Sequence, residues 1–171
     1  KSLVTEHLGI ENIRLMGKRV GASNGDLICV TAGDEPIVNQ ALGNLRTTLG
    51  SRLGLINPNV LAFGFITDFP MFKWSENEKR WEATHHPFTA PRESDIPLLQ
   101  TDTSDVISRA YDLVCNGNEL ASGSIRIHQR HIQEKVFEIL GYNPEQIQDR
   151  FGHFLKALDF GAPPHGGIAS G

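Results

Sequence analysis

A predicted β-hairpin near the middle of the chain carries two carboxylates at a spacing that suits cation chemistry. Asn116-Gly117 is a strong two-residue hairpin turn between β-rich runs. With this turn Val114 lies opposite Glu119, so Asp112 becomes a diagonal neighbour of Glu119 on one face, with Cα atoms about 7–8 Å apart. Two like charges in a closed cleft favour either a bound cation or a raised pKa on one of the carboxylates. Mg²⁺ takes carboxylate ligands and shares them with substrate phosphates.

The strand that returns from this turn changes its alternation part-way. Up to Leu120 the even positions face the core, whereas Ile125 and Ile127 are the apolar residues further along. Because a one-residue slip inverts the faces of a strand, we predict a β-bulge within residues 121–124, whose small side chains permit one. The apolar face of the hairpin is predicted to meet the core and comprises Tyr111, Leu113, Cys115 and Leu120.

The predicted bulge turns Arg126 and His128 onto the face that carries the two carboxylates. Without it Arg126 would point into the core, where an unpaired charge is very costly. Two carboxylates and a guanidinium in one cleft suit a ligand with a metal-bound phosphate and a free carboxylate, which arginine binds through two parallel hydrogen bonds. The residue pattern alone is also consistent with a solvated sheet face that carries scattered ion pairs.

Two adjacent histidines, His85 and His86, follow a predicted strand. Adjacent side chains of a strand face opposite ways, so this pair cannot easily bind one metal ion. Instead of binding a metal ion, one histidine could lie at the edge of the core and the other in solvent. The glycine-rich loop Pro163 to Gly167 could approach a nucleotide through its backbone or be only a turn. The chain has neither a Walker-type phosphate loop nor a Gly-x-Ser-x-Gly nucleophile elbow.

The composition indicates a soluble globular protein. The 171 residues are 39% hydrophobic and 21% charged, which argues against disorder. A net charge of −4 argues against a basic module that binds nucleic acid by charge alone. Cys29 and Cys115 are too few for a disulfide framework or a zinc site and favour a reducing compartment. No apolar run reaches the roughly 20 residues of a membrane span, and residues 1–12 do not resemble a signal peptide.

Apolar periodicity and punctuation predict the elements that position the hairpin. A strand over 26–31 is followed by a helix opened by Asp34-Glu35-Pro36, and Asn57-Pro58-Asn59 marks a boundary. The later segments are a buried strand (61–67), a hairpin with its loop at 73–79, a long surface loop (87–105), and two helices (131–140 and from Asn143 to Gly161).

Five segments, in this order, resemble bacterial-type aspartyl-tRNA synthetase, a class II enzyme. They are Phe69 to Phe72, His85 to Pro91, Ala110 to Val114, Gly123 to His128, and Gly161 to Gly167. The resemblance implies an α+β fold with an antiparallel β-sheet flanked by helices, as in the class II catalytic core. It also implies that residues 1–56 are the C-terminal part of the family's insertion domain and that residues 57–171 are the C-terminal part of the catalytic domain.

The resemblance implies a role for each of five site residues. Glu119 would contact ATP and, with Asp112, the Mg²⁺ ions on its phosphates. Arg126 would bind the side-chain carboxylate of L-aspartate, with His85 on the same ligand and His86 as a supporting group. No residue is expected to act as a covalent catalyst, because this chemistry depends on positioning and charge neutralisation.

The implied reaction makes aspartyl-adenylate from L-aspartate and ATP and passes the aspartyl group to tRNA(Asp). The resemblance further implies a homodimeric, cytoplasmic or organellar enzyme that is not bound to a membrane. The family's anticodon-binding barrel and its first two motifs have no counterpart here, and its third motif should continue past Gly171. We therefore expect a fragment that is inactive by itself. Two alternatives are a non-catalytic folding or interaction module and a sister synthetase for asparagine or lysine, which the run Gly123 to His128 disfavours.

Overall fold

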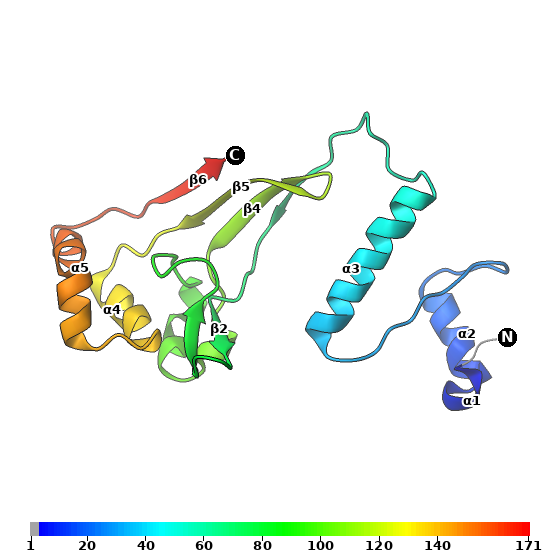
Figure 1. Ribbon diagram of the computed structural model, residues 1–171, viewed down its shortest axis with the longest axis horizontal. Coiled ribbons are helices and arrows are strands. Elements are labelled where there is room, and N and C mark those ends of the chain that lie inside the picture. Colours follow the sequence, from blue (N-terminus) through cyan, green and yellow to red (C-terminus); the bar gives the residue numbers. More distant parts are fainter. Residues whose placement is uncertain (1–3) are drawn as a thin grey trace. The chain divides into compact units, whose positions relative to one another are not determined.

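The computed structural model describes residues 4–171, which form two compact units, one up to Asn59 and the other from Val60 to Gly171. The first unit contains helices α1 (Thr5–Leu8), α2 (Ile10–Arg19) and α3 (Glu35–Arg52) (Figure 1). Helix α3 begins as predicted, with Asp34 at the N-cap position and a proline in the first turn. No residue of α3 is buried, and Ile37 is 64% exposed.

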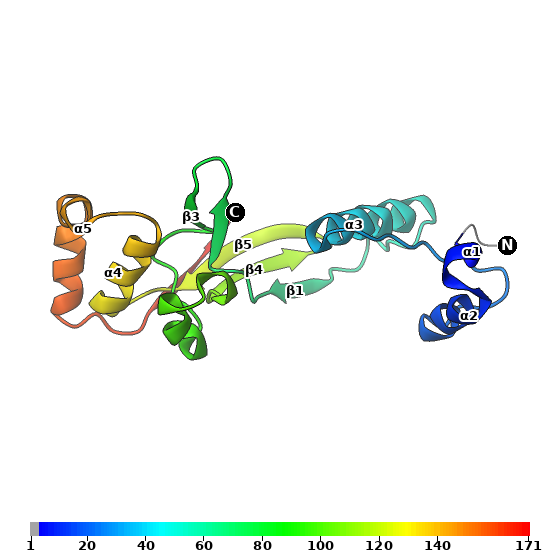
Figure 2. The same ribbon diagram turned by 90° about the horizontal axis from the view of Figure 1, so that it is seen from below.

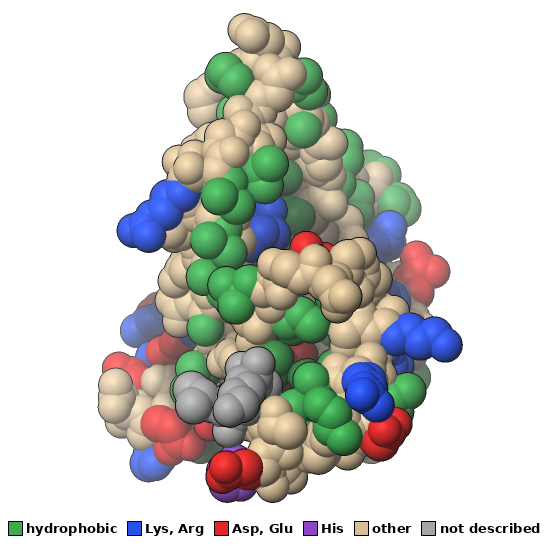
Figure 3. Space-filling view, turned by 90° about the vertical axis from the view of Figure 1, so that its right-hand side faces the viewer, with side chains coloured by type: hydrophobic (Ala, Val, Ile, Leu, Met, Phe, Trp, Pro, Cys, Tyr) green, Lys and Arg blue, Asp and Glu red, His purple; other side chains and the backbone are tan. Residues whose placement is uncertain are grey.

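The prediction of a strand over residues 26–31 is wrong. These residues have no regular secondary structure, and Leu27 is 85% exposed. A strand needs a partner for its backbone groups, and the described residues of this unit contain no strand that could pair with it. Hydrophobic side chains are accordingly open to solvent, as on the face shown in Figure 3.

The second unit is built on a four-stranded antiparallel sheet with the order β1-β4-β5-β6. Its strands are β1 (Phe63–Ile66), β4 (Ala110–Cys115), β5 (Asn118–Ile125) and β6 (Gly166–Ser170). A separate hairpin of β2 (Phe72–Ser75) and β3 (Arg80–Ala83) projects from this sheet (Figure 2). Helices α4 (Arg130–Ile139) and α5 (Pro144–Asp159) pack together at the end of the sheet where β5 leads into α4 (Figure 1). The α+β class with an antiparallel sheet and flanking helices is confirmed.

Two expectations about this unit need correction. The strand predicted over 61–67 forms as β1, but it is exposed rather than buried, with Phe63 at 61% and Phe65 at 63%. The segment 87–105 is more than a surface loop, since it contains the 3₁₀ helices η1 (Glu93–Gln100) and η2 (Thr103–Asp105). Leu99 of η1 is buried in the core, which explains why this proline-containing segment is ordered.

The core of this unit holds the segment His86 to Phe88 against the two helices. One cluster joins the hairpin β2–β3 to α4 and includes Phe72, Val106 and Val136. A second cluster lies between α4 and α5, where Phe88 makes edge contacts with the rings of Phe137, Phe151 and Phe154. Aromatic pairs of this kind stabilise by about 0.5–1.5 kcal/mol beyond the area that they bury.

Helix α5 begins after Asn143, the predicted N-cap residue, which also forms a complete capping box. The Asn143 side chain accepts from the backbone N–H of Gln146, and the Gln146 side chain accepts from that of Asn143, both at 2.9 Å. We expect Asn143→Ala to lower the free energy of unfolding by about 1 kcal/mol in urea denaturation, and Asn143→Ser to stay close to wild type, because serine caps equally well. Equal stability of the alanine and serine variants would contradict this assignment.

Candidate active site

The β4–β5 hairpin contains the predicted register slip, but one residue earlier than predicted. Val114 pairs with Glu119 and Leu113 pairs with Ala121, so Leu120 has no partner residue on β4. The bulge therefore lies at Leu120 and not within residues 121–124. Leu120 was predicted to face the core, yet it is 42% exposed because the bulge turns it outward.

The displaced bulge still gives the predicted result for Arg126. Beyond it Ser122 lies opposite Asp112 and Ser124 lies opposite Ala110, so the even positions of β5 share the face of Asp112. Arg126 continues this alternation, and its Nη1 donates to Ser124 Oγ at 2.6 Å. The guanidinium and the carboxylates of Asp112 and Glu119 thus belong to one face of the sheet.

His86 lies directly beside the Arg126 guanidinium. The Arg126 Nη1 atom contacts Nε2 of the imidazole and lies 3.4 Å from Nδ1, which also faces the backbone N–H of Phe88 at 3.2 Å. Burial lowers the pKa of His86 from its ordinary value of 6.5, and the charge of Arg126 and then that of His85 lower it further. His86 is therefore neutral at neutral pH, which leaves the positive charge at this position to the guanidinium.

The two neighbouring histidines lie in different surroundings, although they follow β3 in a bend and not in a strand. His85 is exposed, and its ring packs edge-on against Phe69 with the ring centroids 4.7 Å apart. The structure therefore brings His86, rather than His85, into contact with Arg126.

Two buried hydroxyls of the site were not predicted from the sequence. Ser124 and Thr89 are 1% and 2% exposed, and Thr89 Oγ1 lies 3.4 Å from Ser124 Oγ. In the sequence, Ser124 stands out only as a small residue that permits a bulge. Its position two residues before Arg126 on one strand was the available signal, since such residues share a face.

An open cavity of about 560 Å³ lies beside this cluster. Three segments meet around it: the segment His86 to Phe88, the end of β5, and the glycine-rich loop that leads into β6. Its lining residues are His86, Phe88, Arg126, Ile127, Phe154, His165, Gly166 and Gly167. A guanidinium at the wall of an open cavity, next to glycines that let a ligand approach the backbone, is suited to an anionic ligand.

A family profile described as tRNA synthetases class II (D, K and N) matches residues 8–171. The chain belongs to this class II synthetase family. An aspartate–tRNA(Asp/Asn) ligase from Dehalococcoides mccartyi is 56% identical over 171 residues, which are 100% of this chain and 29% of that protein. The corresponding ligase from Rubrobacter xylanophilus is 49% identical over 171 residues and 28% of its length. The chain thus spans less than a third of the curated relatives that it matches.

Solved structures of similar proteins include an aspartyl-tRNA synthetase from Entamoeba histolytica. It aligns with a TM-score of 0.46 and 22% identity over 94% of this chain and 26% of that one. Within the described residues of this synthetase chain, no helix is both long enough and apolar enough to cross a membrane.

The carboxylates of this class II chain fit a shared divalent cation. One oxygen of Asp112, Oδ1, is buried without a hydrogen-bond partner, and Glu119 is exposed on the same face. Residues 4–171 contain no cluster of three or more His, Cys, Asp or Glu side chains that could hold a metal by themselves. Mg²⁺ is usually held by one or two carboxylates together with substrate phosphates, so the donor set suits a cation that arrives with a nucleotide.

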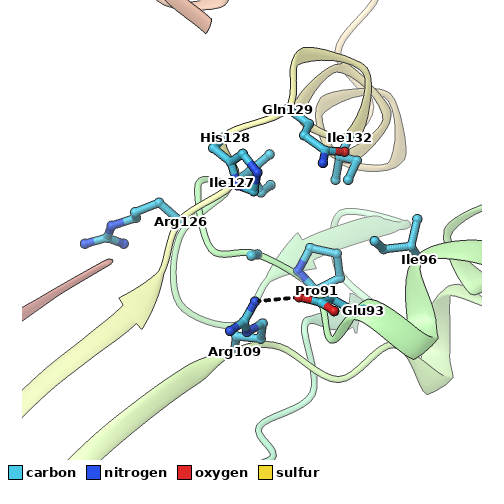
Figure 4. A pocket seen from close by; sticks show the side chains of 10 residues that line it. Pro91, Glu93, Ile96, Arg109, Arg126, Ile127, His128, Gln129 and Ile132 are labelled. Atoms are coloured by element: carbon cyan, nitrogen blue, oxygen red, sulfur yellow. Dashed lines mark hydrogen bonds and ion pairs between the residues drawn. The ribbon is translucent and has the colours of Figure 1, made fainter. Parts of the chain in front are cut away.

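The prediction that His128 shares the face of the Arg126 guanidinium is wrong. His128 lines a second pocket of about 110 Å³, and although Arg126 also contributes to the wall of this pocket, its guanidinium extends away from it (Figure 4). On the other side of this pocket Arg109 forms an ion pair with Glu93 at 3.4 Å. Strand β5 ends at Ile125, so the strict alternation of faces does not continue as far as His128.

The lowered pKa of His86 gives a pH-dependent contribution to stability. Because the folded state holds the imidazole neutral, the unfolded state binds more protons below pH 6.5. This contribution is fully present above that pH and is lost as the pH falls from 6.5 towards the folded pKa. We expect wild type to lose more stability than His86→Gln between pH 7.5 and about 5.5 in urea denaturation. Identical pH profiles of the two proteins would count against a neutral His86.

Proposed function

We propose that this chain is part of an enzyme that activates L-aspartate with ATP and transfers the aspartyl group to tRNA(Asp). The observation that carries the proposal is the Arg126 guanidinium at the wall of an open cavity, beside a neutral, partly buried His86. A fixed guanidinium selects a carboxylate side chain over a neutral amide, since only the carboxylate gives a bidentate ion pair. The family match supports amino-acid activation, and the names of the relatives support aspartate as the amino acid.

The proposed roles of the site residues follow their positions. Arg126 binds the side-chain carboxylate of L-aspartate, His86 supports the guanidinium, and His85 contacts the ligand from its exposed position. Glu119 contacts ATP. Asp112 and Glu119 would hold Mg²⁺, and the unpartnered Oδ1 of Asp112 supports this assignment.

The chemical step requires orientation rather than a protein nucleophile. The α-carboxylate of aspartate attacks the α-phosphate of ATP, a phosphorus–oxygen bond to the leaving group breaks, and pyrophosphate departs. Arg126 fixes the position of the amino acid, so that the attacking oxygen is held in line with the bond that breaks. When bound, Mg²⁺ neutralises negative charge on the phosphates.

The proposal also covers the organisation of the longer enzyme. Residues 1–56 are the end of an insertion domain, and residues 57–171 are the C-terminal part of the catalytic domain, close to the division of the structure at Asn59. The enzyme is a homodimer of the cytoplasm or of an organelle. The names of the relatives include both tRNA(Asp) and tRNA(Asn), so we extend the proposal to tRNA(Asn) as a second acceptor.

The test is ATP–pyrophosphate exchange by the full-length protein that contains this segment. We expect exchange that depends on L-aspartate and is absent with L-asparagine or L-lysine. Exchange driven by asparagine or lysine would identify a sister synthetase. No exchange with any of the three amino acids, together with self-association in sedimentation, would favour an interaction module.

The segment of 171 residues by itself is expected to show no exchange. It covers 29% of the relative from Dehalococcoides mccartyi, and we propose that the remaining part supplies further contacts to ATP. Robust exchange by the purified segment would contradict this division of the site.

A further inference from the structure

Ser124 is a buried serine whose hydroxyl faces the proposed amino-acid site. It lies near the end of β5, opposite Ala110 of β4 and Gly167 of β6, and is 1% exposed. Burying a hydroxyl is costly unless it is hydrogen-bonded. Small or apolar side chains would fill this position of the strand without that cost, so the partners of the hydroxyl indicate what it does.

All partners of the Ser124 hydroxyl belong to the cluster around Arg126. Arg126 Nη1 donates to Ser124 Oγ at 2.6 Å, and Thr89 Oγ1 donates to the same oxygen at 3.4 Å. His86 Nε2 lies 3.5 Å from Ser124 Oγ, and His86 Nδ1 lies 3.4 Å from Thr89 Oγ1. A hydroxyl has two lone pairs and one proton, so Ser124 Oγ can accept from Arg126 and Thr89 at the same time.

The backbone around Thr89 makes this arrangement rigid. Thr89 forms an isolated β-bridge with Arg126, and hydrogen bonds on both sides of the bridge, from Ala90 to Ile125 and from Ile127 to Phe88, measure 2.8 and 2.9 Å. The fully buried Gln133 of α4 donates from Nε2 to the carbonyl of Pro87 at 2.8 Å. The two hydroxyls are therefore held by the sheet on one side and by a helix on the other.

The hydrogen bonds leave one edge of the guanidinium free for a ligand. Among the described residues, every hydrogen bond of the Arg126 side chain is made by its Nη1 atom. The edge formed by Nε and Nη2 can then meet a carboxylate through two parallel hydrogen bonds. An arginine side chain without such an anchor would lose up to about 2 kcal/mol of rotamer entropy on binding.

We propose that Ser124, supported by Thr89, is a positioning residue that orients the Arg126 guanidinium for the side-chain carboxylate of L-aspartate. The proposal rests on the proposed function and adds two residues to its site. It also explains why a polar side chain occupies a nearly inaccessible position of β5.

The test compares Ser124→Ala and Ser124→Cys in the full-length protein by exchange kinetics. Cysteine keeps the volume but is a weak hydrogen-bond partner, whereas alanine removes both the atom and the bond. We expect both variants to raise the KM for L-aspartate by about tenfold, as for one lost hydrogen bond to a charged group. The KM for ATP is expected to stay within about twofold of wild type, because the guanidinium binds only the amino acid.

A second pair of variants tests the supporting hydroxyl. Thr89→Val is nearly isosteric and removes the hydroxyl, whereas Thr89→Ser retains it. We expect the valine variant to raise the KM for L-aspartate and the serine variant to restore it. Ser108→Ala, which truncates another buried serine (6% exposed) outside the cluster, is the control for a loss of packing and is expected to leave both KM values unchanged.

The outcomes separate this inference from the proposed function. A wild-type protein without aspartate-dependent exchange would overturn both. An active wild type whose KM for L-aspartate is unchanged by Ser124→Ala, or whose cysteine variant recovers fully, would overturn the positioning role alone. A parallel rise of both KM values in Ser124→Ala, matched in Ser108→Ala, would reduce Ser124 to a packing residue and overturn it as well.

Discussion

Replacing Arg126 by glutamine in the full-length protein is expected to lower kcat/KM for L-aspartate on the order of 10²-fold, with little change in the KM for ATP. Losing one partner of a desolvated charge pair costs about 2–5 kcal/mol, and each 1.4 kcal/mol is about tenfold. Arg126→Lys keeps the charge but not the planar fork, so we expect an intermediate loss. The measurement is aspartate-dependent ATP–pyrophosphate exchange over a range of aspartate concentrations.

Arg109→Gln is the matched control for this prediction. Arg109 forms its ion pair with the largely exposed Glu93 at 3.4 Å, and exposed pairs contribute about 0–1 kcal/mol. We expect its kcat/KM for L-aspartate to remain within about fivefold of wild type. Similar losses in Arg126→Gln and Arg109→Gln would show that Arg126 acts through general charge rather than by binding the amino acid.

Asp112→Asn is expected to separate activity from stability. Neutralising this carboxylate should lower the exchange rate on the order of 10²-fold at fixed Mg²⁺. It should also raise the Mg²⁺ concentration needed for half-maximal rate by about tenfold, since one charged ligand is lost. Because Oδ1 of Asp112 has no hydrogen-bond partner in the fold, the free energy of unfolding should be unchanged or higher by about 1 kcal/mol.

Asp95→Asn serves as the control, because we expect it to change stability and not the Mg²⁺ dependence. The Asp95 carboxylate accepts from Ser94 at 2.7 Å and from the backbone N–H of Ile107 at 3.1 Å. The hydrogen bond from Ser94 is the main cause that lowers the pKa of Asp95 from its ordinary value. This variant should lose stability without a change in Mg²⁺ dependence. If Asp112→Asn destabilised the protein and left the Mg²⁺ dependence unchanged, Asp112 would be a structural residue.

The register slip shows how far the sequence predicts the site. Alternation on both sides of the slip, with Ile125 and Ile127 as the apolar residues beyond it, is enough to predict an extra residue in the strand. Its position was wrong because Leu120 was taken as a core residue, whereas the fold places the extra residue there and leaves it 42% exposed. Hydrophobicity alone does not distinguish a buried leucine from one displaced by a bulge.

Elements that depend on distant partners were harder to predict than helices. Helices α3 and α5 carry their start signals locally, in Asp34 and in the capping box of Asn143. The residues 26–31 have β-forming side chains but no partner strand among the described residues of their unit. In the site, charged residues could be proposed from the sequence, but the roles of Thr89 and Ser124 depend on a contact between residues 35 positions apart.

One face of the β4–β5 hairpin is proposed to carry the whole set of Arg126, Asp112 and Glu119, with Arg126 for the amino acid and the two carboxylates for the Mg²⁺ of the nucleotide. The most direct measurement is a crystal structure of the full-length protein with L-aspartate, a non-hydrolysable ATP analogue and Mg²⁺. We expect the Arg126 guanidinium on the aspartate side-chain carboxylate, and the carboxylates of Asp112 and Glu119 on the Mg²⁺ ion. A structure in which Arg126 does not touch the amino acid, or in which the two carboxylates face away from the nucleotide, would contradict the claim.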